Sequence, residues 1–196
     1  MALTPSTMVE LGTKASDFSL PDVVSGKTVT LNTFAGKKAL VIVFLSRHCP
    51  YVQHVKTELA ALGSDYRSKS VGMVGICAND VSNHPDDSPE KLRAFALELS
   101  LNYSLCYDQS QAAAKAYTAA CTPDFFLFNE DRKLVYRGQL DDSRPGNNIP
   151  VTGRDLRLAL DAVLAGEPVT SAQKPSLGCN IKWKPGQEPS YARSSN

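Results

Sequence analysis

The strongest constraint on the fold is an uninterrupted apolar run, KALVIVFL, at residues 38–45. A strand with one wet face alternates apolar and polar residues, so a continuous apolar run indicates a strand covered on both faces, as in a parallel sheet. A second such run, VGMVGICA, follows at residues 71–78. Between them, apolar residues recur at helical steps of three and four. They are Val52, Val55, Leu59, Leu62 and Tyr66. Strand, helix and strand in this order predict an α/β fold.

The stretches after residue 78 predict further helices and strands. Ser88 has the side chain of a helix N-cap and Pro89 suits a first helical position, so a second helix is expected there. A short strand over 103–108 and a helix through QAAAKAYTA are expected next. PDFFLF and KLVYRG are then predicted as two strands joined by the tight turn NEDRK, which makes them antiparallel. The sheet is therefore expected to be mixed, with helices on both faces.

Both ends of the chain are expected to add to this core. Apolar stretches on either side of the turn-rich SGK predict a small N-terminal β-hairpin. Thr152 and Asp155 predict a capping box before a last amphipathic helix, which Gly166 is expected to end. We therefore expect one α/β domain over residues 1–166 and a C-terminal tail over residues 167–196.

Charge and cysteine content narrow the function classes. The 21 basic and 20 acidic residues leave a net charge of +1, and no basic patch predicts a nucleic-acid partner. The N-terminal residues lack the pattern of a signal peptide, and the longest apolar run is too short to span a bilayer. We expect a cytoplasmic protein with no membrane partner. In that compartment the five cysteines are expected to be reactive or buried thiols rather than structural disulfides.

One of these cysteines stands at the predicted junction of strand and helix, in FLSRHCPYV. With Pro50 at the first helical position, Cys49 becomes the N-cap, and its sulfur is expected to face the free amides of the first turn. These amides and the helix dipole favour a thiolate, and Arg47 and His48 are expected to add positive charge. Cys49 is therefore the predicted nucleophile. Val52 stands where a Cys-x-x-Cys motif would have its second cysteine.

CPYV at 49–52, CTPDFFLF at 121–128 and the order of strands and helices resemble the thioredoxin-like redoxin superfamily, near its alkyl hydroperoxide reductases, thiol-specific antioxidants and ResA/TlpA-type oxidoreductases. The full set of CPYV, ACTPDF, VYRGQLDDSRP and the tail sequence KPSLGCNIKWK is similar to a bacterial redoxin subgroup. The resemblance implies a thioredoxin-like fold over about residues 10–166 and a cis-proline loop that faces the thiol. Two departures are that Val52 replaces a cysteine and that the proline of the peroxiredoxin signature is missing, although Ser46 fills its threonine place.

The resemblance implies a thiol-dependent oxidoreductase in which Cys49 attacks a peroxide or a protein disulfide, with a thiol reductant such as thioredoxin or glutathione. It implies no cofactor and no metal. Substrate contacts are expected from Pro50, Thr122, Pro123 and Arg144. The alternative is a non-catalytic binding module that uses the cis-proline face to hold a partner protein or a copper-type metal ion. The oligomeric state is left open.

A second cysteine is expected to resolve the oxidised Cys49. The cis-proline loop that the resemblance implies makes Cys121 the first candidate, and Cys179 in the tail is the second. Cys77 and Cys106 lie in predicted buried strands, which favours a purely structural role for both.

Overall fold

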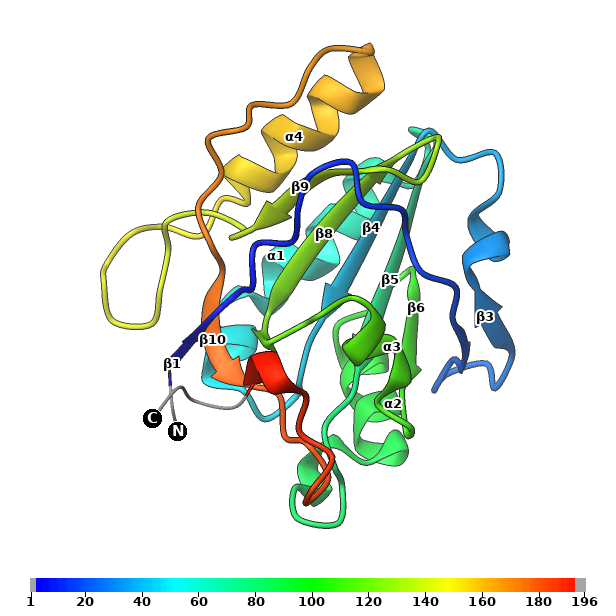
Figure 1. Ribbon diagram of the computed structural model, residues 1–196, viewed down its shortest axis with the longest axis vertical. Coiled ribbons are helices and arrows are strands. Elements are labelled where there is room, and N and C mark those ends of the chain that lie inside the picture. The colour runs from blue at the N-terminus through cyan, green and yellow to red at the C-terminus, as the bar shows by residue number, and fades with distance from the viewer. Residues whose placement is uncertain (1–2, 193–196) are drawn as a thin grey trace.

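A five-stranded mixed sheet forms the centre of the protein, with the strand order β6-β5-β4-β8-β9 (Figure 1). Three neighbouring strands are parallel: β6 (Ser104–Tyr107), β5 (Val71–Cys77) and β4 (Ala39–Phe44). β8 (Asp124–Asn129) is antiparallel to β4, and the edge strand β9 (Leu134–Gly138) is antiparallel to β8. Every residue of β4 is buried, as the apolar run predicts for a central strand covered on both faces.

The computed structural model describes residues 3–192. Helices cover both faces of the sheet, and Figure 1 shows α1 and α3 on opposite sides of it. One face carries α1 (Pro50–Tyr66), α2 (Pro89–Glu98) and α4 (Arg154–Ala165). The other carries α3 (Ala112–Ala116) and the hairpin of β2 (Ser19–Pro21) and β3 (Thr28–Thr30). Residues 3–192 also contain three short 3₁₀ helices: η1 (Leu31–Phe34), η2 (Pro85–Asp87) and η3 (Ser190–Ala192). The predicted fold class is confirmed.

Most of the predicted helix boundaries are confirmed. The five apolar residues that define the stripe of α1 are all buried. Ser88 caps α2, because its Oγ accepts a hydrogen bond from the amide of Lys91 at 3.4 Å. Gly166 ends α4 with φ +74°, a left-handed conformation that glycine adopts without strain. No helix within residues 3–192 is long and apolar enough to cross a membrane.

The predicted capping box at the start of α4 is wrong. The N-cap is Gly153, with φ +65° and no capping side chain of its own. The carboxylate of Asp141 accepts the amides of Thr152 and Gly153 at 2.6 and 2.7 Å, so the cap comes from outside the helix. Asp155 accepts a hydrogen bond from Gln139 instead of reaching back to the N-cap. A distant acceptor therefore replaces the local motif.

A second sheet, which the sequence pattern does not predict, joins the two ends of the chain. Its order is β1-β10-β7, with β1 (Leu3–Pro5), β10 (Leu177–Asn180) and β7 (Cys121–Thr122). Both pairings are antiparallel, and Figure 1 shows β1 and β10 side by side near the start of α1. The segment beyond residue 166 therefore contributes a strand, β10, that pairs with two strands of the preceding domain.

Candidate active site

Cys49 lies where the loop after β4 enters α1. It is the N-cap of α1 and Pro50 occupies the first helical position, as the sequence predicts. Its side chain is fully buried, with an exposed fraction of 0%. The thiol makes no capping hydrogen bond to the first turn and instead donates to the backbone oxygen of Thr122 at 3.1 Å. The expected contact with the helix amides is thus replaced by a contact with the loop at β7.

That loop contains the peptide bond between Thr122 and Pro123, which is cis. Thr122 is 3% exposed, and its hydroxyl has no hydrogen-bond partner among the described residues. Because a buried hydroxyl without a partner is unfavourable, this Oγ1 is available to a small polar molecule beside the thiol. The structure thus brings Thr122 and Cys49 together, as expected from the sequence.

Cys179 is the second thiol at this site. β10 places it directly opposite Thr122 in the antiparallel pair with β7. Burial, and next a hydrogen bond with the Cys49 side chain, raise the pKa of Cys179 to about 12. The two thiols therefore lie close to each other beside Thr122, whose backbone oxygen accepts the Cys49 thiol.

Cys121 lies differently. It precedes Thr122 in β7 and pairs with Asn180, so its side chain leaves the opposite face of the β7-β10 pair from that of Cys179. Its Sγ donates to the backbone oxygen of Pro123 at 3.7 Å. Burial first, and then the charge of Asp124, raise the pKa of Cys121 well above its usual value. Cys121 and Cys179 therefore approach the site from opposite faces of this pair, and which of them resolves Cys49 stays a prediction.

Asp124 begins β8, directly after the cis-proline, and is completely buried. Its Oδ2 accepts the amide of Ala120 at 3.4 Å, and its Oδ1 has no partner among the described residues. Burial raises the pKa of this carboxyl to about 8, although the hydrogen bond from the Ala120 amide opposes the shift. A protonated carboxyl group at neutral pH is the expected state.

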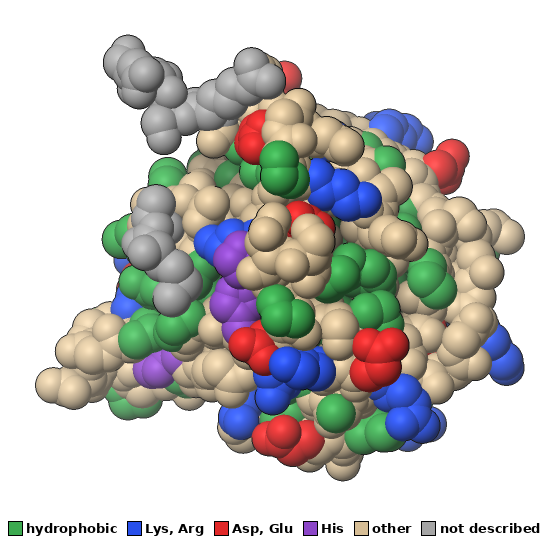
Figure 2. All heavy atoms as spheres, turned by 90° about the horizontal axis from the view of Figure 1, so that it is seen from below, with side chains coloured by type: hydrophobic (Ala, Val, Ile, Leu, Met, Phe, Trp, Pro, Cys, Tyr) green, Lys and Arg blue, Asp and Glu red, His purple; other side chains and the backbone are tan. Residues whose placement is uncertain are grey.

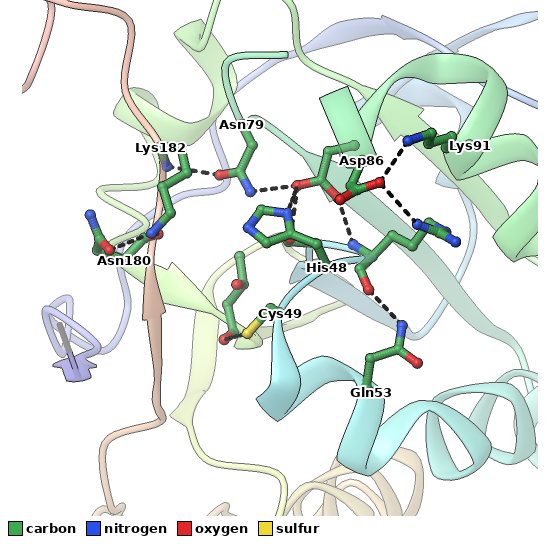
Figure 3. Close-up of polar contacts among 12 residues, drawn as sticks. His48, Cys49, Gln53, Asn79, Asp86, Lys91, Asn180 and Lys182 are labelled. Atoms are coloured by element: carbon green, nitrogen blue, oxygen red, sulfur yellow. Dashed lines mark hydrogen bonds and ion pairs between the residues drawn. The ribbon is translucent and has the colours of Figure 1, made fainter. Parts of the chain in front are cut away.

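A buried carboxylate orders the loop before Cys49. Asp87, at the end of η2, is 0% exposed and accepts four hydrogen bonds. The donors are the Ser46 hydroxyl (2.8 Å), the Arg47 amide (2.7 Å), His48 Nδ1 (2.8 Å) and Asn79 Nδ2 (2.7 Å). Burial opposes ionisation, but the hydrogen bonds from His48, Asn79 and Ser46 outweigh it and lower the pKa of Asp87. Figure 3 shows the His48 ring beside Cys49, between Asn79 and Asp86.

The positive charges expected from the sequence are engaged with these acidic residues. Arg47 pairs with Asp86 at 3.7 Å, and His48 with Asp87 at 2.8 Å. The His84 ring stacks on His48 with centroids 5.4 Å apart. Sequence reasoning missed Asp87 and Asn79, because an acidic loop such as NDVSNHPDDSPE is ordinarily solvated and nothing local signals a partner 41 residues away.

Arg144 and Pro123 line the same small cavity, which has a volume of about 20 Å³, roughly room for one water molecule. The Arg144 guanidinium donates to the backbone oxygens of Asp141 and Ser143 at 2.6 and 2.7 Å, so much of it is engaged with its own loop. Substrate contacts by Arg144 and Pro50 stay predictions.

Within residues 3–192, no group of three or more His, Cys, Asp or Glu side chains is arranged to hold a metal ion. Acidic and basic side chains are interspersed on the end of the molecule that Figure 2 shows, with histidine side chains between them. This mixed surface provides no strong field of one sign to attract a charged substrate.

Comparison with known proteins places this arrangement in a family. The redoxin family model matches residues 10–156. The crystal structure of an uncharacterized conserved protein from Geobacillus kaustophilus is 51% identical, with a TM-score of 0.93 over 94% of this chain and 98% of that chain. A hypothetical protein from Sinorhizobium meliloti is 46% identical, with a TM-score of 0.92 over 93% of this chain and 100% of that chain.

A more distant likeness shows the fold alone. Peroxidoxin BcpB from Mycobacterium tuberculosis is 19% identical, with a TM-score of 0.57 over 79% of this chain and 94% of that chain. No curated protein matches the chain. The family match, which covers more than half of the chain, establishes that the chain belongs to the redoxin family.

Proposed function

We propose that this redoxin is a thiol-dependent oxidoreductase in which Cys49 is the nucleophile and Cys179 resolves its oxidised form. The observation that carries the proposal is that both cysteines lie against Thr122: Cys49 donates to its backbone oxygen, and Cys179 is its partner in the β7-β10 pair. A disulfide requires Cα atoms within about 7 Å and side chains that point towards each other. Two cysteines that lie against the same residue are placed to approach each other in this way.

The chemistry has two steps. The Cys49 thiolate attacks the O–O bond of a peroxide or the S–S bond of a disulfide. With a peroxide, the sulfur becomes a sulfenic acid and the leaving oxygen takes up a proton to form water or an alcohol. With a disulfide, the product is a mixed disulfide and one thiol leaves. Cys179 then attacks Cys49, releases water or the second thiol, and forms the Cys49–Cys179 disulfide.

An external thiol completes the cycle. A reductant such as thioredoxin or glutathione reduces the intramolecular disulfide and returns both cysteines to thiols. A cytoplasmic location, where such reductants are abundant, belongs to the same proposal. The buried Thr122 hydroxyl is the proposed polar contact for the bound oxidant, beside the Thr122 oxygen that already binds the Cys49 thiol.

Mass spectrometry after mild oxidation tests this assignment. The reduced protein is treated with one equivalent of hydrogen peroxide, digested without reduction and searched for linked peptides. We expect one linked pair, Cys49 with Cys179. Cys49→Ser should abolish the link and the consumption of peroxide while preserving the fold, since serine is a good N-cap residue.

Two further variants separate the candidate resolving residues. In Cys179→Ser, Cys49 should proceed to sulfinic acid, because no neighbouring thiol intercepts the sulfenic acid. Cys121→Ser should retain the Cys49–Cys179 link, and Cys106→Ser, in the buried strand β6, serves as the control for a core cysteine. A linked pair of Cys49 with Cys121 would refute the role of Cys179 and restore the loop cysteine as the resolving residue.

A further inference from the structure

β10 occupies the edge of β7 beside the nucleophile. The pairs Cys179–Thr122 and Asn180–Cys121 use the backbone of β7, whose Thr122 oxygen also accepts the Cys49 thiol. The three residues that define this spot are buried, with exposed fractions of 0% for Cys49, 3% for Thr122 and 4% for Cys179. Any extended polypeptide that approaches the thiol along β7 would have to take the place of β10.

Gly178 makes this close approach possible. A Cβ atom added to it would lie 2.0 Å from the backbone oxygen of Thr122 and 2.7 Å from the carbonyl carbon. Both atoms belong to the backbone, so no side-chain rotation relieves the overlap, and any larger residue has to move β10 away from β7. The absence of a side chain at Gly178 therefore allows β10 to pack closely against the loop that faces the Cys49 thiol.

Further hydrogen bonds anchor β10 on both sides. Before the strand, the Ser176 hydroxyl donates to the backbone oxygen of Pro123 at 2.5 Å. After it, the Ile181 amide donates to the Ala120 oxygen at 3.1 Å, and the Lys182 amide donates to Asn79 Oδ1 at 2.8 Å. Figure 3 shows Asn79 between Lys182 and the polar cluster at His48. Displacing β10 means breaking all of these contacts together.

A small molecule can reach the Cys49 thiol with much less movement of the chain than the displacement of β10. Two residues that border the site, His48 and Leu177, are partly exposed, and rotations of such side chains are fast and local. A hydroperoxide has only a few atoms, and its oxygen can accept a hydrogen bond from the Thr122 hydroxyl, which has no partner among the described residues. Size and hydrogen bonding therefore both favour a hydroperoxide over a protein disulfide.

We infer that β10 occupies the edge of β7 along which a protein substrate would otherwise bind. This makes the Cys49 site selective for small hydroperoxides and excludes the disulfides of other proteins. Gly178 is the specificity-determining residue, because it keeps β10 in place. The inference rests on the proposed function and narrows its substrate class. The oxidant is the hydroperoxide, which leaves as water or alcohol, and the reductant is an external thiol that reduces the Cys49–Cys179 disulfide.

The test compares two oxidants and two labels on the full chain. Wild-type protein, with dithiothreitol as reductant, should consume hydrogen peroxide and should not accelerate the reduction of insulin. Gly178→Ala should raise insulin reduction and the labelling of Cys49 by a polyethylene glycol maleimide by roughly tenfold or more, the factor that about 1.4 kcal/mol of lost pairing gives. Labelling by the small reagent iodoacetamide should change much less.

Ser171→Ala is the matched control. It also changes one side chain of the same tail, at an exposed residue before β10, and should behave as wild type. Ser176→Ala, which only deletes a hydroxyl, provides a second loosening variant if Gly178→Ala does not fold, and should move the same readouts in the same direction.

The outcomes separate the two claims. If wild-type protein reduces insulin as fast as it consumes peroxide, or if bulky labelling of Cys49 is unchanged in both loosening variants, the selectivity of β10 is refuted. If neither wild type nor variants react with either oxidant, the proposed function is refuted, while a rise in bulky labelling alone would still support β10 as the cover of Cys49.

Discussion

Replacing Asp124 by asparagine should remove a large part of the pH dependence of stability. Asp124 is completely buried, and burial raises the pKa of its carboxyl from the usual 3.8 to about 8. In the folded protein the group therefore keeps its proton up to about pH 8, whereas in the unfolded chain it loses the proton near about pH 4. Asparagine has nearly the shape of the protonated acid and cannot ionise.

The sign and size of the effect follow from proton binding. Between the two pKa values the folded state holds one proton more than the unfolded state, so the stability contributed by Asp124 is full below about pH 4 and decreases as pH rises towards about 8. Each pH unit in this window lowers the free energy of unfolding by about 1.4 kcal/mol. From about pH 5 to about pH 7 the loss is roughly 3 kcal/mol, or roughly 6–12 °C in Tm for a chain of this size.

Urea unfolding at several pH values measures this loss. The fluorescence of the single tryptophan, Trp183, reports unfolding, and dithiothreitol keeps the thiols reduced. The unfolding free energy of Asp124→Asn minus that of wild type should increase by roughly 3 kcal/mol between about pH 5 and pH 7. Asp86→Asn is the control: hydrogen bonding to Lys91 lowers the pKa of Asp86, so its contribution is constant in this range. Parallel curves for wild type and Asp124→Asn would refute the reasoning.

Two other substitutions test the ordering of the site and of the tail. Asp87→Asn puts amide hydrogens against donors such as Ser46, His48 and Asn79, so it should destabilise the protein by about 1–3 kcal/mol and slow the reaction of Cys49 with peroxide. Urea unfolding measures the first effect and stopped-flow peroxide kinetics the second, and unchanged values would contradict the ordering role of Asp87. Gly138→Ala should cost more than about 2 kcal/mol in urea unfolding, because Gly138 has φ +134° and its Cβ would lie 2.0 Å from the Lys174 oxygen; a wild-type midpoint would refute it.

The central sheet and the nucleophile could be predicted because their signals are local. The run KALVIVFL needs burial on both faces, and the stripe of α1 fixes which helix face packs inwards. Cys49 and Pro50 then fall at the N-cap and the first helical position without reference to any other part of the chain. Such features depend on neighbouring residues alone, so a single sequence carries them.

The parts that could not be predicted depend on contacts distant in sequence. The strand LGCN of β10 is short, contains glycine and lacks alternation, because its register is set by pairing with β1 and β7 rather than by its own propensity. The same pairing places the side chain of Cys179 on the same side as that of Thr122, whose backbone oxygen accepts the Cys49 thiol. Asp87 was missed for a similar reason, since three of its four donors come from the loop before Cys49, 39 to 41 residues away in the sequence.

The position of β10 in the chain has a consequence for biosynthesis. Every other strand precedes it, so a chain emerging from the ribosome can form the central sheet and α1 before residues 177–180 have been translated. During that interval Cys49 has neither its cover nor its neighbouring thiol. A nascent or prematurely terminated chain would thus carry an open nucleophile able to form mixed disulfides with other proteins. Synthesis and docking of β10, rather than folding of the central sheet, closes the site.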